Sequence, residues 1–475
     1  MVGDRASDTG TSTIARTDHG TPIADGDPGR GGPYGRNVSA ASASVFRIAF
    51  GIGIIVNALL YVPRLVGEYY VEPSFHFSYP GFSWVQPAPA VGMYAVYLGM
   101  VVCGGAIALG HHYRWAMGAF FLLTTYVFLL DSTHYQNHEY LISLLALLML
   151  LMPLDRHWSL DARRRPAIAS ATVPVWVVWM LRFQIAVPYF YGGLAKLNGD
   201  WFRGEPLRSW LANRTDIEPI HSVLTDSSIV WIMTYGALIL DLVIVPLLLI
   251  RRTRLPMFLI AVAFHLLNAW LFGLYIFPWL MIAATTIFFD PDWPVVLARR
   301  VRANLGHTGK EPSVEAALHP TSERPRGRLH PALAAFLGIW IAVQIVVPLR
   351  HLAIAGNPSW TEEGHRFAWH MMLRNKTGTA VYEVETGNGI IRVDPRDHLT
   401  VEQGKHIVGH PQRLVQFAHH LSSMYDDAEV RVITDVSMNG RARQPLIDPT
   451  IDLADVPTSW IGHREWILPL TGPAP

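Results

Sequence analysis

Side chains that can ionise are costly to bury in apolar surroundings, so they mark candidate sites when they lie within or beside a hydrophobic stretch. The segment DSTHYQNHEYL places four polar residues just before an apolar run: His134, Asn137, His138 and Glu139. Imidazole and carboxylate groups can donate and accept protons, which is the basis of general acid–base catalysis. The same residues would also suit a polar helix cap with interfacial histidines, and their spacing leaves both interpretations open.

A lysine near the end of another apolar run suggests a second kind of chemistry. Lys196 closes the segment YFYGGLAK, in which Gly192 and Gly193 would let a second helix or a flat ligand approach closely. Burial disfavours the charged form of a lysine, and a neutral amine can act as a general base. The commoner fate of a lysine at the end of a membrane helix is to extend toward the lipid headgroups.

Further polar residues lie inside apolar runs. Arg182 and Gln184 occupy the same run as the two glycines, while His265 and Asn268 are one helical turn apart and would project from one face. Asp241, in another run, is predicted to pair with a basic partner such as Arg182. Structural pairing is the default interpretation for such groups. The histidine, asparagine and lysine residues nevertheless form a candidate site if their runs converge.

The elements that must position these residues are membrane spans. The chain has 475 residues, of which 51% are hydrophobic and only 16% charged, whereas an ordinary soluble domain has about 25% charged residues. A transmembrane helix needs about 20 mostly apolar residues. Nine windows are candidates: 45–61, 91–109, 117–130, 140–152, 173–194, 229–250, 255–272, 274–289 and 331–347. The third, fourth and eighth are short and could be tilted, paired or buried core helices. We predict a polytopic α-helical membrane protein with about eight or nine spans.

Basic residues in short loops predict the orientation, because Lys and Arg are retained on the cytoplasmic side. They fall in every second loop: 111–114, 156–165, 251–254 and 299–302. With nine spans, the N-terminus is cytoplasmic and three polar segments lie outside: 131–139, 196–228 and everything after 350. We also predict a disordered N-terminal tail (1–40), a membrane domain (41–295), a polar cytoplasmic linker (296–330) and a last span (331–350).

The last part of the chain, residues 351–475, changes to ordinary polarity. Alternating polar and apolar residues at 380–386 and 429–438 predict β-strands, and each segment ends at a turn signal, Gly387-Asn388-Gly389 or Asn439-Gly440. Between them, residues 400–425 have a helical rhythm that glycines and a proline interrupt. We therefore predict a small extracytoplasmic domain of β-rich or α+β type.

Composition argues against several classes of function. A formal net charge of +1 offers no electrostatic support for nucleic-acid binding. The single cysteine, Cys103, can form neither an internal disulfide nor a cysteine-based metal site. The histidines lack a tight ligand spacing, so no metal is predicted.

The chain resembles the vitamin K-dependent γ-carboxylase family with its HTTM membrane domain, in a bacterial-type form. In the membrane part the resemblance rests on YQNHEYLISLLALLMLLMPLDRHWSLDARRR, VPVWVVWMLRFQIAVPYFYGGLAKLNGDWFRGEPL and FHLLNAWLFGLYIFPWLMIA. In the last part it rests on VPLRHLAIAGNPSWTEEGHRFAWHMML, VQFAHHLSS and LIDPTIDLADVPTSW. It extends from about Ser39 almost to the end of the chain.

The resemblance implies an enzyme that uses O2 to oxygenate reduced vitamin K, such as menaquinol or phylloquinol, to its epoxide. The strong base so formed takes a γ-proton from a glutamate side chain, and CO2 adds to the carbanion. Lys196 matches the family's catalytic lysine, which deprotonates the hydroquinone. His138, in the Asn-His-x-Tyr motif, matches the histidine tied to carboxylation. Animal members have a lysine just before the catalytic one, where this chain has Ala195.

The resemblance also extends to quinol binding. His265 and Asn268 match a polar pair that lines the quinone region. We expect further contributions from Asn137, Arg182, Gly192 and Gly193. The expected partners are the membrane, a lipid quinol and a glutamate-containing peptide or protein, in a multi-pass protein of a bacterial or archaeal plasma membrane.

Three alternative functions stay open from the sequence. The first is a quinol epoxidase without peptide carboxylation. The second is a transporter, although the sequence has no convincing internal repeat of the kind typical of transporters. The third is a receptor that binds a partner through its C-terminal domain.

Overall fold

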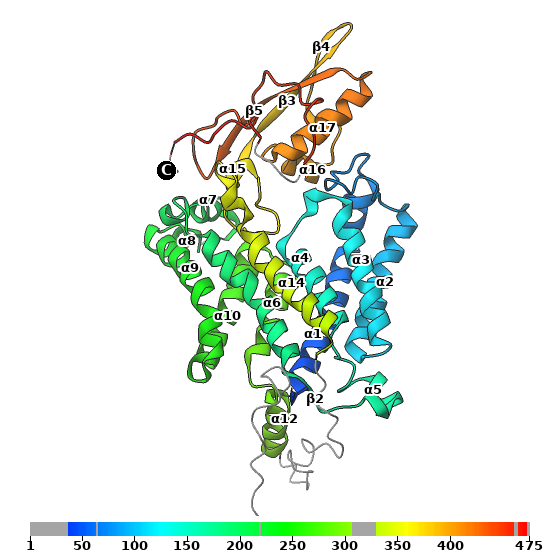
Figure 1. The fold of residues 1–475 in the computed structure, drawn as a ribbon. Coiled ribbons are helices and arrows are strands. Elements are labelled where there is room, and N and C mark those ends of the chain that lie inside the picture. Colours follow the sequence, from blue (N-terminus) through cyan, green and yellow to red (C-terminus); the bar gives the residue numbers. More distant parts are fainter. Residues whose placement is uncertain (1–36, 63–64, 218–219, 306–328, 460–463, 473–475) are drawn as a thin grey trace, which may run out of the picture.

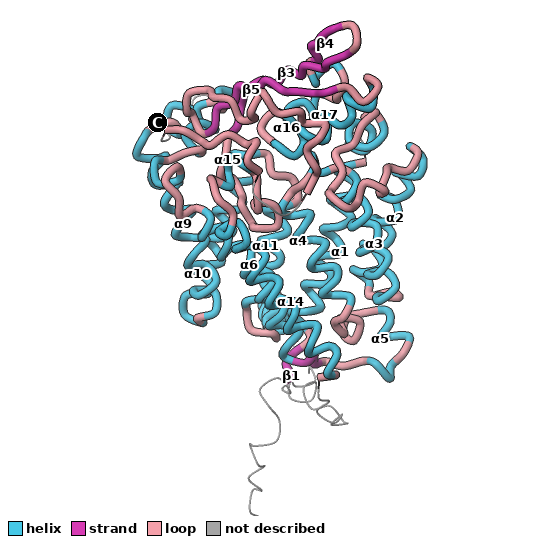
Figure 2. Tube along the Cα trace, turned by 45° about the horizontal axis from the view of Figure 1, so that its top comes forward, coloured by secondary structure: helices cyan, strands magenta, loops and turns pink. Residues whose placement is uncertain are grey.

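The structure, a computed structural model, describes residues 37–62, 65–217, 220–305, 329–459 and 464–472. It consists of a helical bundle and a C-terminal domain that lies across one end of that bundle (Figure 1). The sheet of the C-terminal domain is at that end, and strand β1 lies at the opposite end (Figure 2). This arrangement brings segments that are far apart in the sequence together at the junction between the two parts.

The first half of the bundle contains the helices around the Asn-His motif. Its elements are β1 (Asn37–Ser39), α1 (Ala41–Tyr61), the π-helical turn η2 (Gly67–Val71), α2 (Ala90–Leu109), α3 (Tyr113–Leu130), η3 (Ser132–His134), α4 (Asn137–Leu150), α5 (Leu160–Arg164) and η4 (Pro166–Ile168). Helices α1 and α2 approach closely at Gly51, where a Cβ atom would stand 2.6 Å from the carbonyl oxygen of Gly104. Only small residues permit such an approach.

The second half of the bundle contains the helices around Lys196. Its elements are β2 (Thr172–Pro174), α6 (Val175–Ala195), η5 (Trp201–Arg203), α7 (Leu207–Ala212), η6 (Thr215–Ile217), α8 (His221–Leu224), α9 (Ser227–Leu249), α10 (Arg251–Phe272), α11 (Phe277–Thr285), η7 (Thr286–Phe288), α12 (Trp293–Asn304) and α14 (Pro331–Leu349). Strand β2 pairs antiparallel with β1, so the start of α6 is tied to the segment just before α1.

Six of these helices are long and apolar enough to cross a membrane: α1, α2, α3, α9, α10 and α14. The α11–η7 segment and α12 pass the same test together, but they are bent by 94° at the break between them. Helix α4 is a shorter apolar helix, and α6 has 21 residues with Arg182 and Gln184 inside it. Each of the nine predicted windows therefore contains a helix, and the prediction of a polytopic α-helical membrane protein is confirmed.

The C-terminal domain contains a three-stranded antiparallel sheet. Its elements are η8 (Arg350–Ala353), α15 (Pro358–Thr361), β3 (Lys376–Thr386), β4 (Gly389–Val393), η9 (Pro395–Asp397), α16 (Val401–Ile407), α17 (Pro411–Met424) and β5 (Glu429–Met438). The strand order is β4-β3-β5. Buried and more exposed residues alternate along β5, and α17 packs against that strand, so one face of the sheet is covered. The predicted strands, turns and interrupted helix are confirmed.

The three segments predicted to lie outside do meet at one end. Gln403 of the C-terminal domain donates to Asp131 at 3.1 Å, and Arg441 donates to Asp200 at 2.7 Å. At the other end, Arg164 contacts His111, and α5 and α12 lie far from the C-terminal domain (Figure 1). The grouping predicted from loop charge therefore matches the fold.

Two predicted boundaries need correction. The tail was expected to reach residue 40, but residues 37–39 already form β1 by pairing with β2; residues 1–36 lie outside the described part. The linker was expected from residue 296, yet α12 continues to Asn304. Residues 306–328 lie outside the described part.

Candidate functional site

Lys196 lies where α6 ends, and its side chain turns into the protein rather than toward the headgroups. Its ammonium Nζ is 2.7 Å from the carboxylate Oδ2 of Asp241 on α9, and it also donates to the carbonyl oxygen of Gly192 at 3.1 Å. The two side chains are only 6% and 7% exposed. The indole ring of Trp201 lies 5.2 Å from the same Nζ. The lysine is thus held as one half of a buried ion pair.

The ion pair faces a cavity of about 440 Å³ enclosed by α6, α9, α10 and α11. Most of its lining is apolar, and the polar exceptions are few and grouped. Three of the lining side chains on α9 and α10, Ile232, Ile260 and Leu267, are 67%, 53% and 41% exposed, so the described part of the chain does not cover this side of the cavity. Because these helices are long and apolar enough to span a membrane, the cavity has a wall that faces lipid.

His265 and Asn268 both line this cavity, as the sequence predicts from their positions on one helix face. The Nε2 atom of His265 is 2.6 Å from the hydroxyl of Tyr189, which in turn lies 3.3 Å from the hydroxyl of Thr285. Asn268 donates to the carbonyl oxygen of Phe264 at 2.9 Å. The carboxamide oxygen of Asn268 is not used in that bond.

The C-terminal domain contributes Met371 and Met372 to the lining of the cavity. A Cβ atom at Gly192 would lie 3.0 Å from the methyl carbon of Met371, so the glycine admits this contact. At Gly193 a Cβ atom would stand 2.8 Å from a methyl group of Leu242 on α9. The two glycines therefore bring α6 against its neighbours rather than lining the cavity, and the sequence reasoning anticipated the close approach of a helix.

Arg182 has a different place from the one expected. Its guanidinium donates to the carbonyl oxygens of Ile287 and Phe289, both at 2.9 Å, where η7 ends. It neither lines the cavity nor pairs with Asp241. The predicted Asp241–Arg182 pair is wrong because the free carbonyls at a helix end attract Arg182, and Lys196 reaches the carboxylate.

Asn137 and His138 do not line the cavity either, but His138 lies just behind its wall. Its imidazole centroid is 5.9 Å from the ring of Phe277, and the same ring lies 6.2 Å from His265 and lines the cavity. Asn137 accepts a hydrogen bond from the hydroxyl of Tyr135 at 3.1 Å. Phe277 therefore separates the two groups of polar residues that sequence reasoning expected together.

Sequence reasoning missed a charged cluster where the C-terminal domain meets the bundle. The carboxylate of Glu362 is buried and is contacted by Arg374 at 2.6 Å, Lys376 at 2.9 Å and His365 at 3.0 Å. Burial alone would raise the pKa of Glu362, but these cations hold it well below its usual value. Burial lowers the pKa of Lys376 to about 8. The high density of charged residues in the segment TEEGHRF could have indicated this cluster.

A second residue that sequence reasoning missed is His370, two positions from the cavity residue Met372. Burial, with His351 nearby, lowers the pKa of His370 to about 2. Within the described ranges, no group of three or more His, Cys, Asp or Glu side chains could hold a metal ion.

Two models of known protein families match the chain. The family model of the HTTM domain matches residues 35–293, and the model of the vitamin K-dependent gamma-carboxylase lumenal domain matches residues 329–472. The chain belongs to the vitamin K-dependent γ-carboxylase family. No solved structure matches it. The first match covers the bundle from β1 to α12, and the second covers α14 and the C-terminal domain, so a γ-carboxylase-like function is supported for both parts of the chain.

Proposed function

We propose that the protein is a membrane enzyme that oxygenates a reduced vitamin K, menaquinol or phylloquinol, and couples this reaction to the carboxylation of glutamate. The observation that carries the proposal is the Lys196–Asp241 pair at the wall of an apolar cavity with a lipid-facing side. Family membership supports the same chemistry. The required co-substrates are O2 and CO2, and no metal enters the proposal.

The cavity fits a quinol in size and in the distribution of its polar groups. Ligand pockets commonly measure roughly 300–1,000 Å³ and combine apolar walls with a few polar groups that set orientation. Here the volume is about 440 Å³ and the polar groups include Lys196, Asp241, His265 and Asn268. A quinol head group would bring two hydroxyl groups and a ring that reacts with O2. Its isoprenoid tail would leave between α9 and α10, beside the exposed lining residues.

The pair of Lys196 and Asp241 can provide the base that accepts a proton from the quinol. A coupled amine and carboxylate share protons as a unit, so one proton can pass from Lys196 to Asp241 and leave the amine neutral with no net charge in the cavity. The neutral amine then takes a proton from a quinol hydroxyl. The regenerated ammonium stabilises the quinolate oxygen. Met371 and Met372 line the cavity and limit access of water.

We assign the carboxylation half of the reaction to the side of Phe277 where His138 lies. The imidazole of His138 lies next to that ring, and Asn137 precedes it at the start of α4. A glutamate side chain from a peptide would reach this region from the outer face, beneath the C-terminal domain. Asn268 and His265 act on the quinol side of the same ring.

For orientation, we propose that the basic end of the bundle is cytoplasmic. Retention of Lys and Arg on that side then places the N-terminus in the cytoplasm and the C-terminal domain outside. The membrane would be the plasma membrane of a bacterial or archaeal cell. The candidate site, which lies beneath the C-terminal domain, would then be close to the outer face.

The test is a reaction of purified protein with chemically reduced menaquinone, O2, labelled bicarbonate and a glutamate-rich peptide. We expect both the quinone epoxide and label fixed in the peptide, and we expect Lys196→Ala to lose both. A mixture that yields neither product with folded wild-type protein would contradict the proposal.

A quinol epoxidase without carboxylation is the second candidate. It is favoured by one observation: His138 and Asn137 lie outside the cavity that contains Lys196. In the same reaction mixture this function predicts epoxide without fixed label.

A further inference from the structure

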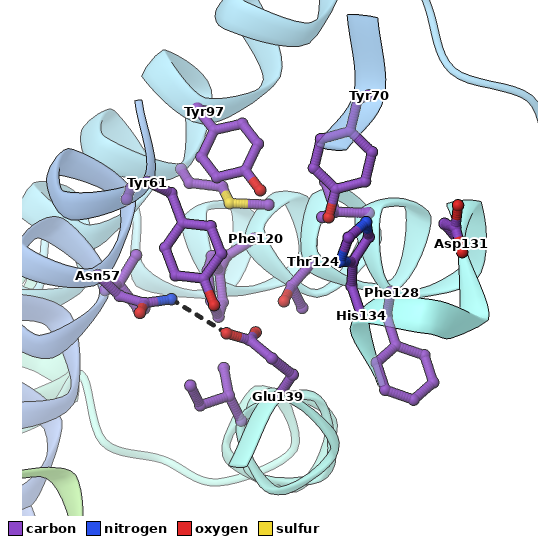
Figure 3. Close-up of a pocket in the computed structure, with 15 residues that line it drawn as sticks. Asn57, Tyr61, Tyr70, Tyr97, Phe120, Thr124, Phe128, Asp131, His134 and Glu139 are labelled. Atoms are coloured by element: carbon purple, nitrogen blue, oxygen red, sulfur yellow. Dashed lines mark hydrogen bonds between the residues drawn. The ribbon is translucent and has the colours of Figure 1, made fainter. Parts of the chain in front are cut away.

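A second, smaller cavity lies among the first four helices of the bundle. It measures about 40 Å³ and is bounded by side chains of α1, α2, α3 and α4. Figure 3 shows the hydroxyl groups of Tyr61 and Thr124 pointing toward the carboxylate of Glu139. The carboxylate accepts a hydrogen bond from the amide of Asn57 at 3.4 Å. A carboxylate surrounded by hydroxyl groups is unusual for an apolar bundle.

The polar lining predicts that this cavity holds water. Buried polar atoms beside it have no hydrogen-bond partner within the described part of the chain: Oδ1 of Asn57 and Nε2 of His134. Such atoms are costly to bury unless water satisfies them. One buried water needs roughly 10–15 Å³ of this kind of volume, so the cavity has room for about three.

His138 does not line the cavity, but it lies directly beside the lining residue Glu139. The Nε2 atom of His138 lies 3.5 Å from Oε1 of Glu139, but it makes no hydrogen bond to any described residue. The two side chains are 13% and 22% exposed. A small movement of either would close the distance to hydrogen-bond length. The imidazole and the carboxylate are thus placed to exchange a proton.

The other end of the cavity lies beside the C-terminal domain, where Gln403 donates to the lining residue Asp131 at 3.1 Å. His134 and Asp131 line this end, and Asp131 contacts His76, whose side chain is 10% exposed, at 3.3 Å. The ring of His134 stacks on Tyr69 with a centroid distance of 3.7 Å. Burial lowers the pKa of His134 to about 4, so its ring is neutral and one nitrogen is an acceptor.

We infer that this cavity is a hydrated proton relay in which Glu139 carries protons between His138 and the outer surface. The inference rests on the proposed function. The overall reaction turns quinol, O2, a glutamate C–H group and CO2 into the epoxide, water, the new carboxylate and one proton. That proton has to leave a site shielded from bulk water. In the relay, the Nε2 atom of His138 takes up this released proton as a new N–H bond. That N–H bond then breaks as an O–H bond forms at Glu139, which leaves His138 neutral. Glu139 gives the proton to cavity water next to His134 and is a carboxylate again.

The decisive variant is Glu139→Gln, which keeps the shape of the side chain and a hydrogen bond to Asn57 but cannot carry a proton. We expect the turnover rate of carboxylation to fall at least tenfold, with a larger solvent deuterium isotope effect and an unchanged KM for the quinol. Glu139→Asp should recover part of the rate. The matched control is Glu383→Gln on β3, since Glu383 pairs with the exposed Arg392 far from both cavities. A wild-type rate and an unchanged isotope effect in Glu139→Gln would overturn the relay.

A second measurement does not depend on turnover. Infrared difference spectra should show a carboxylic-acid band that appears on acidification, shifts in D2O within seconds, and is missing in Glu139→Gln. A band that does not exchange would show that Glu139 is a dry packing residue and would overturn the inference. If wild-type protein forms neither epoxide nor carboxylated peptide while the band exchanges, the proposed function fails and the hydrated relay stands.

Discussion

The distance between Lys196 and Asp241 predicts how much the buried ion pair contributes to the free energy of unfolding. Asp241→Asn removes the charge that lies 2.7 Å from Nζ of Lys196 while keeping the shape of the side chain. Coulomb's law assigns roughly 6 kcal/mol to two unit charges at that separation for an effective dielectric constant of about 20. Desolvation of both groups offsets part of this attraction. Breaking one side of such a pair commonly costs about 3–5 kcal/mol, because a buried charge is left without a partner.

A double-mutant cycle with Asp241→Asn and Lys196→Met measures the pairing itself. We expect each single variant to lower the free energy of unfolding by about 3 kcal/mol, and the double variant to lose less than their sum, with a coupling energy of about 3 kcal/mol. Unfolding in mixed micelles, followed by tryptophan fluorescence, provides the values. The exposed pair Arg392–Glu383 is the control and should show coupling below about 1 kcal/mol. Additive effects of the two single changes would refute the buried pair.

Three further predictions concern the packing at Gly193, the pH dependence of stability, and the position of Arg182 outside the quinol cavity. Gly193→Ala should destabilise the bundle by about 1–2 kcal/mol because its Cβ atom would crowd α9, whereas Gly53→Ala, with no atom within 4 Å, should have little effect in the same unfolding assay. Folding lowers the pKa of His370 from 6.5 to about 2, so the unfolded protein takes up a proton at this residue below pH 6.5 and the folded protein does not. The free energy of unfolding should therefore decline below pH 6.5 by up to about 1.4 kcal/mol per pH unit. In His370→Phe, the unfolding midpoint should depend less steeply on pH. Arg182→Met should lower the free energy of unfolding by about 2 kcal/mol, because the bonds from Arg182 to the carbonyl oxygens of Ile287 and Phe289 are lost. The KM for the quinol should stay unchanged. A raised KM would show that Arg182 does contribute to quinol binding.

Much of the fold could be predicted because it depends on local patterns. Apolar length predicts helices at all nine windows, and alternation predicts β3 and β5. Loop charge predicts which segments share an end of the bundle, since each added helix reverses the chain. Asp290, Pro291 and Asp292 mark the break between η7 and α12 in the sequence, but the bend of 94° at that break depends on tertiary packing and could not be predicted.

The candidate site was predicted in its residue types but not in its pairings. Sequence spacing predicts that His265 and Asn268 share a helix face, and both line the cavity. Lys196 lines the same cavity from the end of another helix, which depends on how α6 and α10 are packed. The partner of Asp241 depends on how α6 and α9 are packed, and that is a tertiary contact without a local signal. The placement of Phe277 between His138 and the cavity is likewise a result of tertiary packing and has no local signal in the sequence.

The most direct test of the central claim is a structure with menaquinone bound, in lipid nanodiscs. We predict that the quinone ring lies in the cavity between α6, α9 and α10, within roughly 4 Å of Nζ of Lys196, with its tail leaving toward the lipid between α9 and α10. A ring bound elsewhere, with that cavity occupied only by lipid or water, would contradict the assignment of Lys196 as the base.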